Sequence, residues 1–367
     1  MDLVEFVFPA SVLPFKVDDE FVDKCRDSLG DTKYIWSHGD VPTATEQQLA
    51  TFLNKICDAI ATASGQRALK EWDAKYSNTI LRGSSIRRKP DVVLLDRDFT
   101  GIPMWQQVHA VAELTTSASE HHRIIRTVTD KTYIMLGAQP NRVFVPVISA
   151  WGASKFRLTV TDRQGQLRTK TFNIAGGVRR ADLRTLIHIL TSLCFGRNKA
   201  VGYDETMIMG QGGVDVILCA GKEFKIIDLI YATQSLIGRA TRVWIVEHNE
   251  RKYILKDAWT EQCRPVSEAE HLTKLAGMAG IPKLFCAEDI PGLSTGNLRC
   301  GLNSDKNKHR IRRRIVTSSC GSHIATFRSK RELLLALKDI VVSTSYYHYF
   351  HPEILIVCSS SQNTRYR

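Results

Sequence analysis

Two consecutive segments in the second half of the chain carry apolar residues at every second position. Val243 and Ile245 carry the alternation before a polar turn at 248–251, and Tyr253 and Leu255 carry it after the turn. Period-two alternation is typical of β-strands that bury one face. We therefore predict two paired strands joined by a short turn, with a lysine at the end of the second strand.

A short helix is predicted directly after these strands. Leu272 and Leu275 recur at helical spacing, which places Glu268 on or beside the buried face of the helix. From there its carboxylate can turn back toward Lys256, the lysine at the strand end. A lysine oriented by a glutamate in this way can bind the α- and β-phosphates of a nucleotide. The alternative is a plain β-hairpin with a solvent-exposed lysine.

The first half of the chain is predicted to mix helices and strands. Residues 1–40 contain a short apolar, strand-like segment, and a capping box of Thr43 and Glu46 predicts the start of a helix. The apolar pattern then predicts strands at 91–95, 108–114 and 143–149, a helix at 120–136, strand-like runs at 155–160 and 167–174, and a helix at 181–193. Glycines follow, which divide the chain into a mixed α/β domain at 1–196, a glycine-rich junction at 197–222 and a second domain at 223–367.

The rest of the second domain is predicted to add one more strand and one more helix, so the fold class is α+β. Residues 281–285 are predicted to form another strand of the same sheet, and residues 288–307 a polar insertion with glycine turns. Ser329 and Glu332 form a capping box, and the apolar residues that follow predict a helix.

Composition and charge add a weak indication about partners. With 43% hydrophobic and 24% charged residues the chain suits a globular protein, and its formal net charge is +12. A basic balance favours nucleic acid, acidic proteins or phosphate ligands as partners. Six lysines and arginines crowd together between 306 and 314. They indicate either a nucleic-acid or nuclear-import patch, or a solvated loop that leads into a strand.

The cysteines and the apolar runs indicate where the protein resides. Nine cysteines are scattered without a C-x-x-C pair, which predicts reduced thiols in an intracellular compartment. The N-terminal segment carries Asp2 and Glu5 and lacks a basic start, so we expect no secretory signal. No apolar run reaches membrane-spanning length. We expect a location in the cytoplasm or nucleus, with no membrane partner.

Three short motifs give the chain a family resemblance. GRATRVW, YILKDAW and SEAEHL, within 238–272, resemble the nucleotide-binding half of the fungal-type protein kinases. In that resemblance Gly238 matches a glycine of the phosphate-covering loop and Val243 the valine over the adenine. Lys256 matches the lysine of the third strand, and Glu268 the glutamate of the helix after it. A full G-x-G-x-x-G is absent, so contact between backbone and phosphate is expected to be weaker.

The resemblance implies a protein-kinase-like N-lobe, meaning a twisted antiparallel sheet with one helix, followed by the first helix of an incomplete C-lobe. It covers roughly the last 170 residues, and by family the activity is ATP-dependent serine/threonine phosphotransfer. The chain contains neither H-R-D nor D-F-G, and Asp339 is its last aspartate. We therefore expect no kinase activity, weak ATP binding and no magnesium site. Such an ending resembles a truncated gene model, a skipped exon or a degenerate copy, and the exposed apolar helix predicts a protein partner or aggregation.

A second resemblance lies in the first domain. Pro90-Asp91, followed by Glu113 on the next predicted strand, is similar to the core of the PD-(D/E)-x-K nucleases. In those enzymes two carboxylates bind magnesium and a lysine two residues after the glutamate activates water. Here Thr115 stands at the lysine position, so the predicted site is degenerate. For the motif itself, the alternative is that the two acids merely cap strand ends. For the whole protein, the alternative functions are a nuclease-like or nucleic-acid-binding module and a pseudokinase-type interaction protein.

Overall fold

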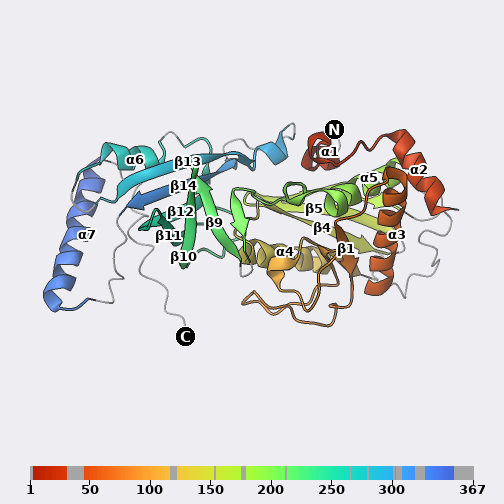
Figure 1. Cartoon of the computed structure of the whole chain (residues 1–367), viewed down its shortest axis with the longest axis horizontal. Helices are drawn as coiled ribbons and strands as arrows, with labels where there is room; N and C mark the ends of the chain where they lie inside the picture. Colours follow the sequence, from red (N-terminus) through yellow and green to blue (C-terminus); the bar gives the residue numbers. More distant parts are fainter. Residues whose placement is uncertain are drawn as a thin grey trace.

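The computed structural model has two halves that lie side by side, each built on a mainly antiparallel sheet (Figure 1). It describes residues 3–30, 45–115, 122–152, 154–174, 179–210, 213–264, 266–278, 281–300, 302, 308–318 and 327–350. The architecture is mixed α and β, as the sequence predicts.

The first half combines a sheet with helices on both of its faces. Its helices are α1 (Leu3–Val7), α2 (Asp19–Leu29), α3 (Glu46–Ser64), α4 (His122–Ala138) and α5 (Arg180–Leu190), with helical turns at Ala10–Val12, Trp105–Gln107, Thr191–Phe195 and Asn198–Val201. Its strands are β1 (Lys70–Asp73), β2 (Val92–Asp96), β3 (Ala110–Thr115), β4 (Phe144–Trp151), β5 (Lys155–Asp162), β6 (Gly165–Arg168) and β7 (Phe172–Asn173). The strand-like segment expected within residues 1–40 is helical instead, because α1 and α2 bury one apolar stripe each.

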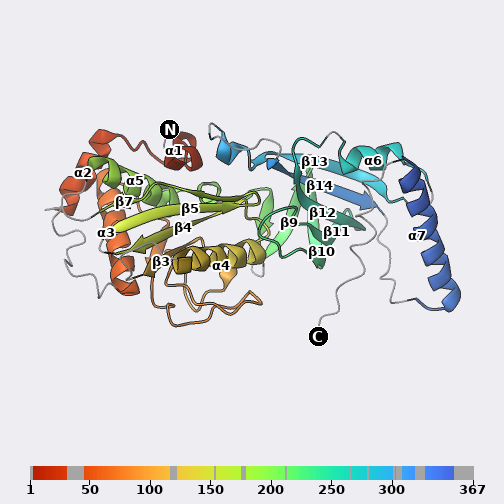
Figure 2. The ribbon, with the colours of Figure 1, turned by 180° about the vertical axis from the view of Figure 1, so that it is seen from behind.

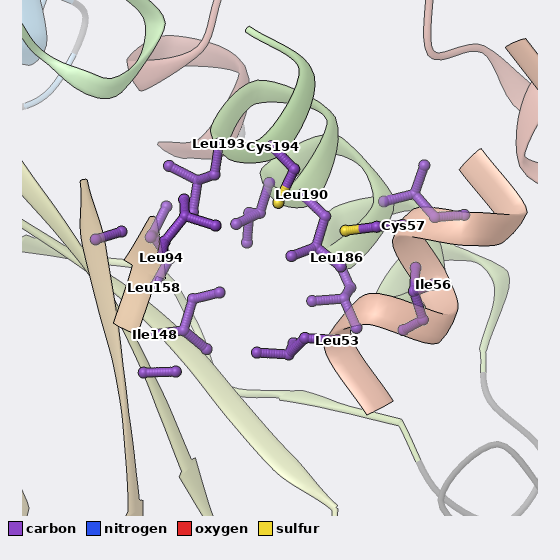
Figure 3. Packing of buried hydrophobic residues seen from close by; sticks show 14 of the residues in the cluster. Leu53, Ile56, Cys57, Leu94, Ile148, Leu158, Leu186, Leu190, Leu193 and Cys194 are labelled. Carbon is purple, nitrogen blue, oxygen red and sulfur yellow. The ribbon is translucent and has the colours of Figure 1, made fainter. Parts of the chain in front are cut away.

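The first sheet has the strand order β1-β2-β3-β4-β5-β6, with β7 paired to β5. β3 and β4 run parallel, and α4 is the crossover that parallel neighbours require. Helices α3 and α5 cover one face of the sheet and α4 covers the other (Figure 2). Buried side chains alternate between these faces: Leu94 packs toward α3 and α5, and Val93 packs toward α4. The larger hydrophobic core of the protein lies among these layers, and Figure 3 shows the part of it between α3, α5 and the sheet.

The second half is a curled antiparallel sheet with two helices. Its strands are β8 (Met207–Met209), β9 (Val214–Cys219), β10 (Lys222–Ala232), β11 (Arg242–His248), β12 (Arg251–Glu261), β13 (Lys283–Ser294) and β14 (Arg310–Ser318). Its helices are α6 (Glu268–Lys274) and α7 (Lys330–Phe350), with a helical turn at Asn297–Arg299. The strand order is β13-β14-β12-β11-β10-β9-β8, yet β9 also contacts β13, so the sheet bends back on itself.

Three boundaries differ from the sequence prediction. Strands β8 and β9 lie inside the predicted junction 197–222 and pair with β10, so the second sheet begins within that segment. Residues 288–294, expected as part of a polar insertion, continue β13, because they pair with β14. Helix α3 is capped by Thr45 and Gln48, whose side chains bond the backbone reciprocally. The predicted partner Thr43 lies outside the described residues.

Buried arginines join the two halves. Arg299 pairs with Asp162 of β5, and Arg242 donates to the carbonyl oxygens of Leu136 and Gly137 at the end of α4, at 3.0 and 2.6 Å. Apolar residues of the second half, Trp259 among them, also belong to the larger core. The halves therefore share one continuous interior.

Candidate functional site

Lys256 and Glu268 form an ion pair on the second sheet. Lys256 lies on β12, and its Nζ is 2.8 Å from both carboxylate oxygens of Glu268, the first residue of α6. Ser267 caps this helix by accepting from the Glu270 amide, so the helix starts where Glu268 can reach the strand. The predicted contact between Lys256 and Glu268 is confirmed.

The strand register decides which side chains share a face with Lys256. Lys256 lies opposite Val243 on β11 and opposite Ile315 on β14. Directly opposed residues of antiparallel strands point to the same face. Val243, Lys256 and Ile315 therefore line one face, beside α6, and Asp257 points to the other.

The space next to the ion pair is small and highly charged. A cavity of about 40 Å³ lies beside Lys256 and Glu268, and the second cation near the glutamate is Arg239, at 3.9 Å. The cavity is lined by Arg239, Lys256, Ala258, Thr260, Arg264, Ser267, Glu268, Ala269, Ala287, Glu288, Asp289, Arg313, Arg314 and Ile315. Sites for small-molecule ligands usually enclose about 300–1,000 Å³. A nucleotide therefore needs this site to widen.

The loop predicted to cover phosphates is attached to the first half. Gly238 lies between β10 and β11 with φ of 107°, a conformation that favours glycine, and its amide donates to the Arg163 carbonyl at 2.9 Å. The Arg163 guanidinium in turn donates to the Ser235 carbonyl at 2.9 Å, and burial lowers the pKa of Arg163 to about 9. Neither Gly238 nor Val243 lines the cavity beside Lys256, so their assignment to nucleotide binding stays a prediction.

The opposite face of the same strands carries a buried network of charges. Arg312 and Arg314 of β14 each place Nε 2.9 Å from an oxygen of Asp257. Arg314 also donates to Asp204, in the segment before β8, at 2.5 Å. Burial alone would raise the pKa of Asp257, but Arg312 and Arg314 hold it below its usual value.

This network corrects both interpretations of the basic cluster at 306–314 for two of its residues. Arg312 and Arg314 are neither a nucleic-acid patch nor a solvated loop, since both side chains are fully buried in the core of the protein. Sequence reasoning missed them because their partners, Asp204 and Asp257, lie far away in the chain. The signal present in the sequence is that Ile311 and Ile315 enclose Arg312 and Arg314 within a short run that ends in a strand-like pattern.

The two acids of the first domain also lie together, with a lysine that sequence reasoning missed. Lys131 of α4 places Nζ 2.9 and 3.2 Å from the two carboxylate oxygens of Glu113 on β3. Asp91 accepts from the Leu114 amide at 2.8 Å. Burial raises the pKa of Glu113 to about 7, with Asp91 acting in the same direction and Lys131 opposing it. The available signal was that Lys131 interrupts the buried apolar stripe of α4 between Val128 and Met135.

A cavity of about 610 Å³ opens beside these acids. It is lined by Glu46, Arg88, Lys89, Asp91, Glu113, Leu114, Thr115, Ile124, Arg126, Thr127, Asp130 and Lys131. Among the residues that the structure describes, no group of three histidine, cysteine or acidic side chains could hold a metal ion. No described helix is long and apolar enough to cross a membrane. The segment after residue 350, in which neither H-R-D nor D-F-G occurs, lies outside the described residues.

Comparison with known proteins supports the resemblance seen in the motifs. The profile of one family, the fungal protein kinases, matches residues 89–348. No curated protein and no solved structure matches the chain. The match begins before β2 and ends within α7, so it includes the second sheet and all strands of the first sheet except β1, and it reaches further toward the N-terminus than the motifs indicated. The chain therefore belongs to the fungal protein kinase family.

Proposed function

We propose that the second sheet binds ATP weakly through Lys256 and Glu268, and that this chain by itself does not transfer phosphate. Membership of the fungal protein kinase family supports the ATP-binding part of this proposal. The observation that carries the proposal is the ion pair of Lys256 with both oxygens of Glu268 at 2.8 Å, on the face that also presents Val243. The glutamate fixes the direction of the ammonium group, as phosphate binding requires.

The chemistry that remains is binding without a catalytic base. Orienting an acceptor hydroxyl takes an aspartate in the catalytic loop, and magnesium takes an asparagine and a second aspartate. Neither H-R-D nor D-F-G occurs in this chain. Binding should therefore be largely independent of magnesium, and the 40 Å³ cavity implies that part of the binding energy is spent on opening the site.

An ATP titration followed by thermal unfolding tests the proposal. We expect ATP to raise the midpoint of wild type, equally with Mg²⁺ and with EDTA, and to leave Lys256→Ala unchanged. Lys252→Ala is the matched control, since Lys252 is an exposed lysine on the same strand. Equal shifts for wild type and Lys256→Ala would remove the assignment of Lys256 to phosphate binding.

A second candidate function is nucleic-acid binding by the first domain. The observation in its favour is that Lys131 of α4 places a lysine beside Glu113, although the residue two positions after Glu113 on β3 is Thr115. The cavity rim also carries exposed Lys89 and Arg126, which are suited to phosphate groups. The order from α3 to β4 is helix, three strands, helix, strand, which has one strand, β1, more than the order helix, strand, strand, helix, strand on which the nuclease-like resemblance rests.

The residues present fit binding better than cleavage. Lys131 occupies both oxygens of Glu113, and Asp91 is engaged by the Leu114 amide, so the pair offers a metal ion few free oxygen ligands. We therefore derive no metal-dependent step from this site. We expect labelled DNA to bind with an affinity that falls steeply with salt, and Lys89→Ala with Arg126→Ala to weaken it. If the protein cleaved DNA in the presence of Mg²⁺, and Asp91→Asn abolished that cleavage, the proposal of binding without cleavage would be contradicted.

A further inference from the structure

Two cysteines approach each other where the second sheet bends back on itself. The sulfur atoms of Cys219, at the end of β9, and Cys286, on β13, are 4.0 Å apart. β9 and β13 are not hydrogen-bonded neighbours in the sheet order, and one further link between these segments is the Ala220 amide, which donates to Glu288 at 2.6 Å. The two thiols therefore lie where β9 and β13 are in contact without being paired strands.

The two thiols differ in accessibility and acidity. Cys219 is fully buried, whereas Cys286 is partly exposed. The hydrogen bond with Cys219, helped by the charge of Lys222, lowers the pKa of Cys286, while the same bond and burial raise the pKa of Cys219. A partly exposed thiol of lowered pKa beside a second thiol is the arrangement that oxidants attack first.

We propose that Cys286 and Cys219 form a reversible disulfide when a peroxide is present. The Cys286 thiolate attacks one peroxide oxygen and breaks the O–O bond, which yields Cys286 sulfenic acid and hydroxide. The thiol of Cys219 then displaces the sulfenic hydroxyl group, which forms the S–S bond and releases water. Overall, two thiols are oxidised by two electrons and one hydrogen peroxide is reduced to two waters.

The backbone next to Cys286 can shift enough to bring its sulfur atom within bonding distance of the Cys219 sulfur. The sulfurs of a disulfide are about 2 Å apart. The pairing of β13 with β14 shifts register between Leu284 and Cys286, and such irregularities let a strand bend locally. β13 also lines the cavity beside Lys256 through Ala287, Glu288 and Asp289, so the bond would fix one wall of that cavity. The proposal does not depend on nucleotide binding.

Tryptic mapping of the full chain after treatment with hydrogen peroxide tests the proposal directly. Cys219 falls in the tryptic peptide 200–222 and Cys286 in 284–299, each with a single cysteine. We expect a linked pair of these peptides that disappears on reduction. Exposed Cys263 and Cys300 serve as internal controls, because alkylating agents can reach both whether or not the proposed bond forms.

A stability measurement gives a second readout. The link closes a loop of 67 residues, so peroxide should raise the unfolding midpoint of wild type by several degrees. Cys286→Ser should abolish the linked peptides and the rise, and Cys219→Ala, which removes only the resolving thiol, should leave Cys286 trapped as a sulfenic acid. Oxidation of Cys286 in wild type to sulfinic acid, or links only to Cys263 or Cys300, would overturn the proposal.

Discussion

At the residue scale, the local pattern predicts one pair of interacting side chains and misses others. Lys256 and Glu268 are 12 residues apart on consecutive elements, so strand period and helix period together place them. Lys131 and Glu113 are 18 residues apart but meet across a parallel crossover, whose packing no local pattern fixes. Arg312 and Arg314 could not be placed, because a buried arginine depends on acids from distant segments.

Glu113 gives a prediction about pH at this scale. Its folded pKa of about 7 lies above the ordinary value of 4.5, so between these values the folded state binds more protons than the unfolded state. The carboxyl therefore contributes stability at low pH that is lost as pH rises toward 7. Relative to Glu113→Gln, wild type should lose about 2 kcal/mol of unfolding free energy between pH 5 and 7.5, as measured by denaturant titration. A constant difference between the two proteins would contradict this.

At the scale of elements, α7 stands apart from both sheets at one end of the molecule (Figure 1). Of its predicted capping box, one bond is confirmed, because the Glu332 amide donates to the Ser329 hydroxyl, whereas the Glu332 carboxylate accepts from the Arg328 amide, one residue before the predicted partner. Its exposure follows the prediction too: Leu334 and Val341 are 65% and 63% exposed, and Leu337 between them is also exposed. Positions i, i+3 and i+7 form one helix face, so α7 presents an apolar stripe to solvent.

This stripe predicts self-association or a partner. Leu334→Glu with Val341→Glu should raise the monomer fraction in light scattering, because charges replace an exposed apolar face. The unfolding midpoint should change little, since neither side chain is buried. Lys338→Glu is a control for the added negative charge on the same helix. Unchanged association in the double variant would show that the stripe is not the contact.

At the scale of the whole molecule, the sequence predicts two domains but not how firmly they are joined. The glycines near 196–213 suggested a junction, yet strands within that segment complete the second sheet, and Asp204 enters the arginine network. There Asp204, which precedes β8, and Asp257 of β12 pair with Arg312 and Arg314 of β14. Such contacts form only after distant segments have met, so they leave no periodic trace in the sequence.

Removing Asp257 should destabilise the whole protein. Asp257→Ala leaves Arg312 and Arg314 without their shared carboxylate in the interior, at a cost of about 3–5 kcal/mol. Asp289→Ala, which removes the half-exposed partner of Arg313, should cost less than about 1 kcal/mol. Both values come from chemical unfolding of the full chain. If the two variants lost similar amounts of unfolding free energy, the buried network would stabilise the protein no more than a surface ion pair does.

We propose that the ion pair of Lys256 and Glu268 binds phosphate in this chain as a member of the fungal protein kinase family. Calorimetric titration of ATP into wild type, Lys256→Met and Lys252→Met tests it most directly. We expect weak binding to wild type and Lys252→Met, and an affinity at least about tenfold lower for Lys256→Met, which corresponds to about 1.4 kcal/mol. The same affinity in all three proteins would contradict it.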